Sequence, residues 1–231
     1  MEIRPDVHLI QGRASNFYLC TGSDELTLID TGMPNEQQLL FGLLDQLGHH
    51  HQQLSRIIIT HADIDHAGSL AAIQSATGAA VYAGEQTAHY LQKGTTPPHL
   101  PRLVQWFTNA FLKYQPVGAD CLKILRDGDQ LPVLNGLLVA IATPGHTDEH
   151  FSFYSAADGI LFAGDALSTR NGRLQRTPRW ITDDEEAANQ SAIHLIQLAP
   201  ATIACGHGDP MSDHEMGDLM RFFNQLRENG K

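Results

Sequence analysis

Four potential metal ligands lie within the six residues His61-Ala62-Asp63-Ile64-Asp65-His66. The cluster directly follows Leu54–Thr60, a short β-branched apolar run that is typical of a buried strand. We therefore expect the ligands at the carboxyl end of a strand, where open α/β folds build their sites. Imidazoles mixed with carboxylates favour zinc, iron or manganese over calcium or magnesium. For this segment alone, the alternative is a polar loop whose aspartates cap a helix.

Three further strand ends carry one His or Asp each. Leu137–Ala142 is followed by His146, Gly159–Ala163 by Asp165, and Ala201–Cys205 by His207. A glycine stands beside each of these residues, and glycine lets the backbone approach closely or adopt a positive φ. Two metal ions that share one donor would need about this many ligands. The candidate ligands are His61, Asp63, Asp65, His66, His146, Asp165 and His207.

With Leu28-Ile29-Asp30-Thr31-Gly32 upstream, the motifs follow the order found in the metallo-β-lactamase superfamily, which the chain resembles from residue 28 to residue 208. The resemblance implies the α/β class and a four-layer αββα sandwich, with the metals in a groove at one edge and a single domain over residues 1–231. Asp30 would support the site behind the ligands. The resemblance also implies a ligand set: His61, Asp63 and His146 for the first metal, Asp65, His66 and His207 for the second, and Asp165 bridging both.

The cluster departs from the family's usual His-x-His-x-Asp-His, because Asp63 stands in place of the second histidine. A carboxylate is a harder donor and adds negative charge, which shifts preference towards iron or manganese without excluding zinc. Flavodiiron proteins of the same superfamily also carry a carboxylate there, although theirs is glutamate. We expect two divalent ions, with zinc favoured and iron or manganese as alternatives. His150 is expected to support the site rather than to act as a further ligand.

Composition is that of a compact enzyme acting on small molecules. The 231 residues are 42% hydrophobic, which is enough for one α/β domain with a substantial core. The net charge of −11 argues against broad binding to nucleic acid or to acidic membranes, and it leaves the oligomeric state open. The first residues lack an apolar signal core, and no apolar run approaches membrane-spanning length, so a cytoplasmic location is predicted.

The remaining strands and helices are predicted from the spacing of apolar residues and from residues that typically begin or end a helix. A capping box at Thr182 and Glu185 predicts a helix to about Ala199. The predicted strands are Val7–Gln11, Asn16–Thr21 and Glu25–Asp30, and two further helices are predicted over Asn35–Gly48 and His66–Gly78.

Residues 92–119 do not fit the alternation of strands and helices. The segment is either an extra helix packed on the sandwich or a lid insertion over the metal groove. As a lid, it would place Trp106, Phe107 and Phe111 against the substrate. Isolated histidines are expected to be structural or exposed, and His99 is the one of them within this segment.

A group of arginines follows Asp165 closely, at positions 170, 173, 176 and 179. They would either pair with the acidic residues 183–186 on the surface or bind an anionic group of the substrate. In the second case Arg170 and Arg173 are the candidate substrate contacts.

Together these features predict hydrolysis of a small ester, thioester, lactone or lactam by a hydroxide that bridges two metals. Asp65 would orient this nucleophile and pass a proton to the leaving group. Two alternatives keep the fold: an iron-dependent oxidoreductase, favoured by Asp63, and a small-molecule phosphodiesterase. A non-catalytic binding protein is disfavoured, because every candidate position holds a group able to ligate metal.

Overall fold

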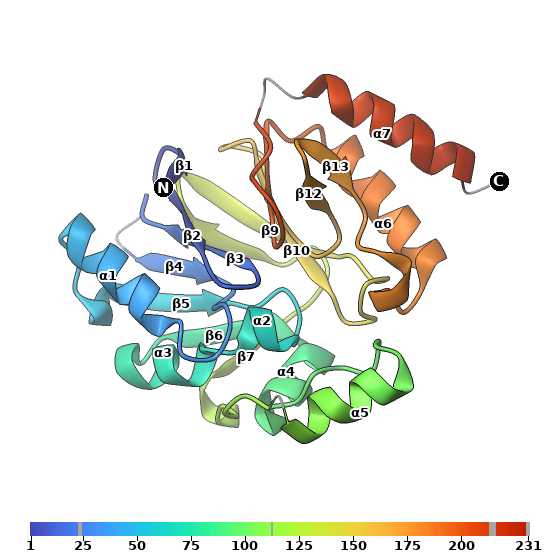
Figure 1. Ribbon diagram of the computed structural model, residues 1–231. Coiled ribbons are helices and arrows are strands. Elements are labelled where there is room, and N and C mark those ends of the chain that lie inside the picture. The colour runs from blue at the N-terminus through green and yellow to red at the C-terminus, as the bar shows by residue number, and fades with distance from the viewer. Residues whose placement is uncertain (23–24, 112, 213–215, 230–231) are drawn as a thin grey trace.

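The computed structural model describes residues 1–22, 25–111, 113–212 and 216–229, and two β-sheets form its centre (Figure 1). The first sheet runs in sequence order from β1 to β7. Its strands are antiparallel up to the β3–β4 pair and parallel from the β4–β5 pair onwards. The strands are β1 (Glu2–Arg4), β2 (Val7–Gln11), β3 (Asn16–Cys20), β4 (Leu26–Ile29), β5 (Leu54–Ile58), β6 (Ala80–Gly84) and β7 (Leu122–Leu125).

The second sheet has the order β14-β11-β10-β9-β8 and is antiparallel except for its β11–β14 pair. A small hairpin of β12 (Ser168–Arg170) and β13 (Arg173–Gln175) follows β11. The strands of the second sheet are β8 (Gln130–Val133), β9 (Gly136–Ala142), β10 (Phe151–Ser155), β11 (Ile160–Gly164) and β14 (Thr202–Cys205).

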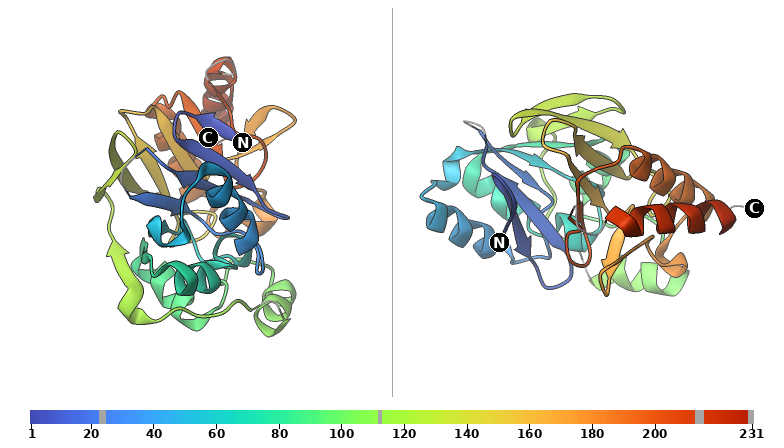
Figure 2. Two further views of the ribbon diagram at one scale, coloured as in Figure 1. Left: turned by 90° about the vertical axis from the view of Figure 1, so that its left-hand side faces the viewer. Right: turned by 90° about the horizontal axis from the view of Figure 1, so that it is seen from above.

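Helices cover the outer face of each sheet, as the two views of Figure 2 show. Three apolar cores separate the layers: one under the helices of the first sheet, one between the sheets and one under the helices of the second sheet. The four-layer αββα prediction is thereby confirmed. The helices are α1 (Gln37–Leu47), α3 (Leu70–Thr77) and α4 (Glu85–Lys93) on one side, and α6 (Glu185–Gln197) and α7 (Met216–Asn229) on the other. No helix among the described residues is long and apolar enough to cross a membrane.

The helix predicted over residues 66–78 is wrong in one respect, because it is interrupted at Gly68 and Ser69. A short helix, α2 (Ile64–Ala67), carries the end of the ligand cluster, and α3 starts afresh at Leu70. The Ser69 hydroxyl donates to the Met33 carbonyl and accepts the Glu36 N–H. A Cβ at residue 68 would overlap Pro34. The break therefore lets the chain lie against the loop after β4.

The predicted N-cap of α6 is also wrong. Asp184, not Thr182, caps this helix, with its Oδ1 accepting the Ala187 N–H at 3.0 Å. The Thr182 hydroxyl instead donates to the Pro178 carbonyl at 3.0 Å. This local hydrogen bond, four residues back along the chain, removes the hydroxyl from competition for the helix end.

The segment 92–119 contains one helix, α5 (Arg102–Phe111), which lies outside the two sheets (Figure 1). It is joined to the rest of the protein through loops on both sides. Tyr114, in the loop after α5, is buried. Its hydroxyl lies 3.0 Å from the Ala62 carbonyl and 3.2 Å from the Thr95 carbonyl. Ala62 stands between two candidate ligands, so the segment is anchored beside the ligand cluster.

Candidate metal site

The candidate ligands come together where β5, β9, β11 and β14 end. Three overlapping groups form among the described residues, and in each group the ligand atoms all lie within 4.8 Å of one another. The first group is His61, Asp63 and His146, and the second group is Asp65, His66 and His207. These two groups match the two ligand sets that the sequence resemblance implies. The third group joins Asp165 to His61 of the first group and His66 of the second.

The Asp165 carboxylate lies between the two groups. Its Oδ2 is 3.6 Å from His146 Nε2 in the first group and 3.1 Å from His207 Nε2 in the second. Its Oδ1 is 3.2 Å from His66 Nε2. One carboxylate therefore faces imidazoles of both groups, as a bridging ligand must.

Several polar atoms in these groups are buried and have no hydrogen-bond partner among the residues the structure describes. Buried polar atoms are otherwise nearly always hydrogen-bonded, because leaving one unpaired costs about 1–3 kcal/mol. A cation that the atoms share would satisfy them together, so this donor set fits a metal centre. The atoms are His61 Nε2, His66 Nε2, His146 Nε2, Asp63 Oδ1 and Asp165 Oδ1.

Asp30 orients two of the imidazoles from behind. Its carboxylate accepts hydrogen bonds from the Thr60 N–H, the Thr60 hydroxyl and His66 Nδ1, each at 2.9 Å. Since the Thr60 hydroxyl donates to Asp30, its oxygen is free to accept from His61 Nδ1 at 3.0 Å. With metal bound, both histidines would keep their proton on Nδ1 and offer the Nε2 lone pair to the site, in the tautomer that binds metal. Asp30 itself has φ of 59°, a left-handed conformation that Asp and Asn tolerate better than most residues.

His150 holds the bridging residue rather than facing the site with a free nitrogen. Its Nε2 accepts the backbone N–H of Asp165 at 2.9 Å, and its Nδ1 lies 2.7 Å from the Thr143 hydroxyl. Burial, reinforced by His61 and His146, holds the pKa of His150 well below its ordinary value. Neutral His150 thus uses both nitrogens within the protein.

Two glycines allow the close packing of this site. A Cβ at Gly206 would overlap Asp165 and His66, so the end of β14 can pass beside them only without a side chain. Gly145 has φ of 139°, and a Cβ there would overlap the backbone of Ala188 at the start of α6. The glycines beside the ligands therefore serve the close approach that their sequence positions predict.

The ligands form strongly interacting pairs. Burial alone would raise the pKa of Asp63, but the surrounding imidazoles hold it well below its ordinary value. The pKa of Asp165 is held low in the same way, against burial, mainly by His207 and His66. The charge of Asp165 raises the pKa of His207 to about 9. The carboxylates are therefore ionised, which is the form that binds cations.

Sequence reasoning missed His99, which is neither exposed nor remote. Its side chain is 2% exposed, and its Nε2 lies 3.1 Å from Asp63 Oδ2 in the first group. His99 belongs to the loop between α4 and α5, within the segment that does not fit the alternation. The one signal in the sequence was Asp63, which stands where the family usually has the second histidine of the cluster. Its presence could have prompted a search for an imidazole in another segment.

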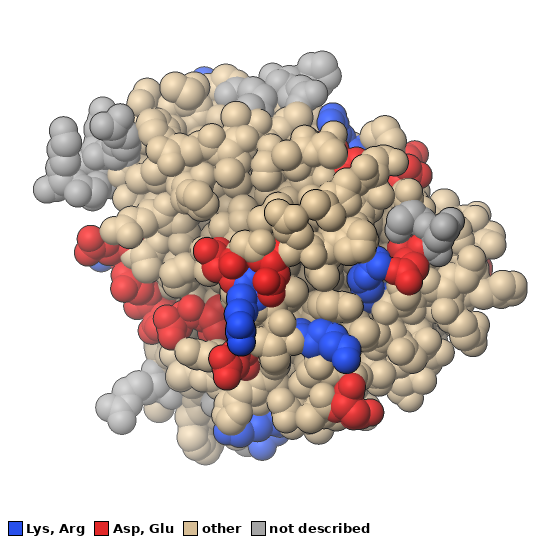
Figure 3. All heavy atoms as spheres, turned by 180° about the vertical axis from the view of Figure 1, so that it is seen from behind, with Lys and Arg blue, Asp and Glu red and all other residues tan. Residues whose placement is uncertain are grey.

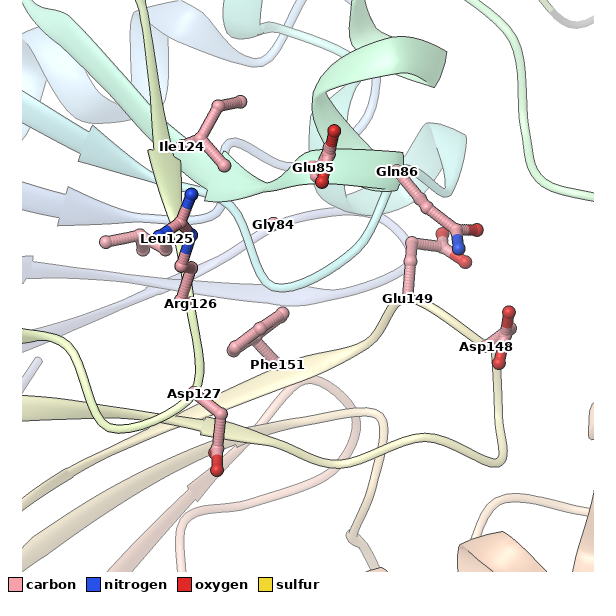
Figure 4. A pocket seen from close by; sticks show the side chains of 10 residues that line it. All are labelled: Gly84, Glu85, Gln86, Ile124, Leu125, Arg126, Asp127, Asp148, Glu149 and Phe151. Carbon is pink, nitrogen blue, oxygen red and sulfur yellow. The ribbon is translucent and has the colours of Figure 1, made fainter.

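Glu149 is a second buried residue that the sequence did not single out. Burial, reinforced by Asp63, raises its pKa to about 7. Figure 4 shows it on the lining of a pocket of about 330 Å³ at the ends of β6 and β7, together with Gln86 and Phe151. This pocket contains none of the candidate ligands, so it lies beside the metal site rather than in it.

The predicted substrate contacts are mostly exposed. Trp106 and Phe107 of α5 are 66% and 53% exposed, while the side chain of Phe111 lies outside the described part of the structure. Arg170 and Arg173 lie directly opposite each other in the antiparallel β12–β13 hairpin, and both are exposed. Two other arginines turn towards α6: Arg176 donates to the Glu185 carbonyl at 3.2 Å, and Arg179 forms an ion pair with the Glu185 carboxylate.

Charged groups of both signs are scattered over the face shown in Figure 3, and the basic ones form no continuous patch there. This agrees with the acidic balance of the whole sequence, in which 26 acidic residues face 15 basic ones. The surface in this view offers no broad site for a polyanion.

Comparison with known proteins gives a consistent family. The sequence pattern of the metallo-beta-lactamase superfamily matches residues 10–207. YobT of Bacillus subtilis (strain 168), an uncharacterized protein, is 32% identical over 84% of this chain and 82% of its own length. YflN of the same strain, a probable metallo-hydrolase, is 29% identical over 97% of this chain and 92% of its own. A hydroxyacylglutathione hydrolase of Rhodobacter capsulatus is 30% identical over 81% of this chain but only 59% of its own length.

Solved structures share the fold. A metallo-beta-lactamase family protein from Thermus thermophilus superposes with a TM-score of 0.75 at 23% identity, over 98% of this chain and 81% of that one. The Rm3 metallo-beta-lactamase gives a TM-score of 0.70 at 24% identity, over 97% and 81%.

Proposed function

Because this chain belongs to the metallo-β-lactamase superfamily and is a metal-dependent hydrolase, we propose that it cleaves a small ester, thioester, lactone or lactam at a dinuclear centre. The observation that carries the dinuclear part is the Asp165 carboxylate, which lies 3.1–3.6 Å from imidazoles of both ligand groups. Asp165 would bridge the two ions, and each group would supply the remaining ligands of one ion.

When bound, two divalent cations supply a water of lowered pKa and positive charge for the substrate oxygen. The chain's own residues then orient the reaction. Asp65 Oδ2 lies 3.4 Å from His207 Nε2, and its side chain is 21% exposed, so it reaches the centre from the open side. From there Oδ2 can accept the proton of the attacking water and return it to the leaving group.

Zinc is the proposed metal for both positions, since histidine and aspartate are both common zinc ligands and each position combines two imidazoles with carboxylates. Asp63 makes the first group harder than the usual arrangement of the family, and this favours iron or manganese as substitutes there. An iron-dependent oxidation is therefore the second candidate function, and it rests on Asp63 alone.

Thioesters are the first substrates to test within this class. Some relatives are named hydroxyacylglutathione hydrolases, and an acyl group on the glutathione thiol is a thioester. This chain spans only about half of their length. We further propose that residues 92–119 form a lid whose Trp106, Phe107 and Phe111 contact the apolar part of the substrate. Arg170 and Arg173 would contact an anionic part, for which a guanidinium is well shaped.

A substrate panel with controlled metal content tests the proposal. Protein stripped with a chelator is reloaded with zinc, iron or manganese and assayed on a thioester, an ester, a lactone, a lactam and a phosphodiester. We expect cleavage of at least one carbonyl substrate that disappears on chelation and in Asp165→Ala. Cleavage of the phosphodiester alone would replace the proposed substrate class. Oxygen consumption by the iron form without hydrolysis by any form would favour the oxidative alternative.

A further inference from the structure

His99 enters the metal site from a segment that supplies none of the other ligands. It lies in the loop between α4 and α5, whereas the other ligands follow strands of the two sheets. Its side chain is 2% exposed, and its Nε2 has no hydrogen-bond partner among the described residues. This nitrogen is 3.1 Å from Asp63 Oδ2, so it faces the first group directly.

The hydrogen bonding of His99 is that of a ligand histidine. Its Nδ1 lies 3.1 Å from the Pro97 carbonyl, which can only accept, so Nδ1 carries a proton. His207 uses its Nδ1 in the same way on the Ala14 carbonyl, and His66 uses its Nδ1 on Asp30. In each case the outer nitrogen is anchored and Nε2 points into the site, which is the usual arrangement around a metal. His150 differs, because both of its nitrogens have partners within the protein.

When His99 is neutral, its contact with Asp63 needs a cation, whereas a protonated His99 would donate from Nε2 to Asp63 directly. A neutral imidazole with its proton on Nδ1 presents a lone pair at Nε2, and the Asp63 carboxylate presents another. Two such acceptors 3.1 Å apart repel each other unless positive charge lies between them. Two nitrogen or oxygen ligands of one tetrahedral zinc ion lie about 3.3 Å apart, given bonds of about 2.0–2.1 Å. The distances from Asp63 Oδ2 to His99, His146 and His61 are 3.1, 3.4 and 3.6 Å, all close to that value.

We propose that His99 Nε2 is a protein ligand of the first metal ion, together with His61, Asp63 and His146. This inference rests on the dinuclear site proposed above. It restores to the first site an imidazole in compensation for the one that Asp63 displaces. With the shared Asp165, the first site would then hold three imidazoles and two carboxylates from this chain, and residues 92–119 would supply one of the imidazoles, that of His99.

The loop that carries His99 is built to hold it in place. Gln105 of α5 accepts the backbone N–H groups of His99 and Leu100 at 3.2 and 3.1 Å. On the other side, the Tyr114 hydroxyl ties the segment to Ala62, the residue between His61 and Asp63. The segment is thus fixed to the ligand cluster both before and after α5.

The first experiment compares metal affinity in His99→Phe with that in the parent and in His89→Ala. Phenylalanine keeps a planar ring in the buried position but offers no donor, and His89 is an exposed histidine of α4 in the same region. Competition with a chelator gives the dissociation constants of both ions. We expect His99→Phe to weaken one of the two ions by roughly 100-fold or more, since losing a ligand exceeds the 10–100-fold effect of losing an outer partner. His89→Ala should match the parent.

A second readout identifies the bond itself and remains informative if the Phe variant folds poorly. Parent protein labelled with ¹⁵N-histidine and loaded with ¹¹³Cd should show a cadmium–nitrogen scalar coupling at His99 Nε2, as at His61 and His146. A coupling at His61 and His146 without one at His99 would overturn the inference and leave His99 as a hydrogen-bond donor to Asp63. A parent that binds no metal would instead overturn the proposed function, so the two failures are distinct.

Discussion

Replacing Asp30 by Asn should weaken one metal ion selectively, through a tautomer change at His66. The substitution is nearly isosteric, and Asn tolerates the left-handed backbone that Asp30 adopts at φ of 59°. The amide oxygen can take the place of Oδ1, which accepts the Thr60 N–H at 2.9 Å. The amide nitrogen then takes the place of Oδ2 and faces His66 Nδ1, which lies 2.9 Å away.

Two donors cannot face each other at that distance, so His66 must move its proton from Nδ1 to Nε2. Nε2 is the atom that points at Asp165 from 3.2 Å, and in its protonated form it cannot bind a metal. To bind metal, His66 must return this proton to Nδ1 and so lose the hydrogen bond from Nε2 to the charged Asp165 carboxylate. A hydrogen bond to a charged group is worth about 1.5–3 kcal/mol. The second ion should therefore bind roughly 10- to 100-fold more weakly. The first ion should change less, because His61 Nδ1 can still donate to the Thr60 hydroxyl.

Chelator competition on the purified variant measures both binding steps, and circular dichroism checks that the fold is kept. Asp184→Asn is the matched control, because Asp184 is an exposed cap of α6 and Asn caps helices equally well. If both dissociation constants of Asp30→Asn equal those of the parent, Asp30 does not set the tautomer of His66. An equal loss at both sites would show that Asp30 acts on the whole cluster rather than on one imidazole.

Four other changes test separate parts of the site. Asp165→Ala should lower metal content and abolish hydrolysis, because it removes the carboxylate between both groups; a fully loaded and active variant would contradict the bridge. Asp63→His should move the metal preference towards zinc, and an unchanged ranking in competition titrations would count against a tuning role for Asp63. In the metal-free protein, the pKa of Glu149 is raised from 4.5 to about 7, so the folded state retains a proton that the unfolded state releases. Stability should therefore fall as pH rises between these values, and above about pH 7 Glu149→Gln should exceed the parent by up to ~3 kcal/mol, at about 1.36 kcal/mol per pKa unit; equal urea midpoints there would refute this. Arg173→Gln should raise KM for an anionic substrate roughly tenfold and spare a neutral one, whereas Arg179→Gln, whose parent side chain is paired with Glu185, should change neither.

The ligand cluster and the sheets were readable from the sequence because their signals are local. Each strand next to a ligand is a short β-branched or apolar run ended by glycine or a polar residue, and the predicted strand Val7–Gln11 agrees with β2 at both ends. Errors arose where a competing hydrogen bond overrides the predicted one. Ser69 leaves the predicted helix for a long-range bond to Met33, whereas Thr182 leaves its predicted cap for the nearby Pro178 carbonyl.

His99 could not be found by spacing, since no local pattern links it to Asp63, which lies 36 positions away in the sequence. Its place depends on Gln105, which bonds the His99 N–H within the segment, and on Tyr114, whose long-range bond to the Ala62 carbonyl ties the segment to the cluster. The same holds for Glu149, whose burial beside Asp63 is a property of the assembled layers. Contacts of this kind require the folded chain.

The distribution of ligands over the two sheets has a consequence for assembly. His61, Asp63, Asp65 and His66 follow a strand of the first sheet, whereas His146, Asp165 and His207 follow strands of the second. On the proposed assignment, each ion would take ligands from both halves of the chain and link them, beyond what the apolar core between the sheets provides. If the protein were supplied as two fragments divided between β7 and β8, the concentration of free divalent metal would govern how tightly the fragments associate. The centre that carries the chemistry would then also be a metal-controlled clamp between two separate polypeptides.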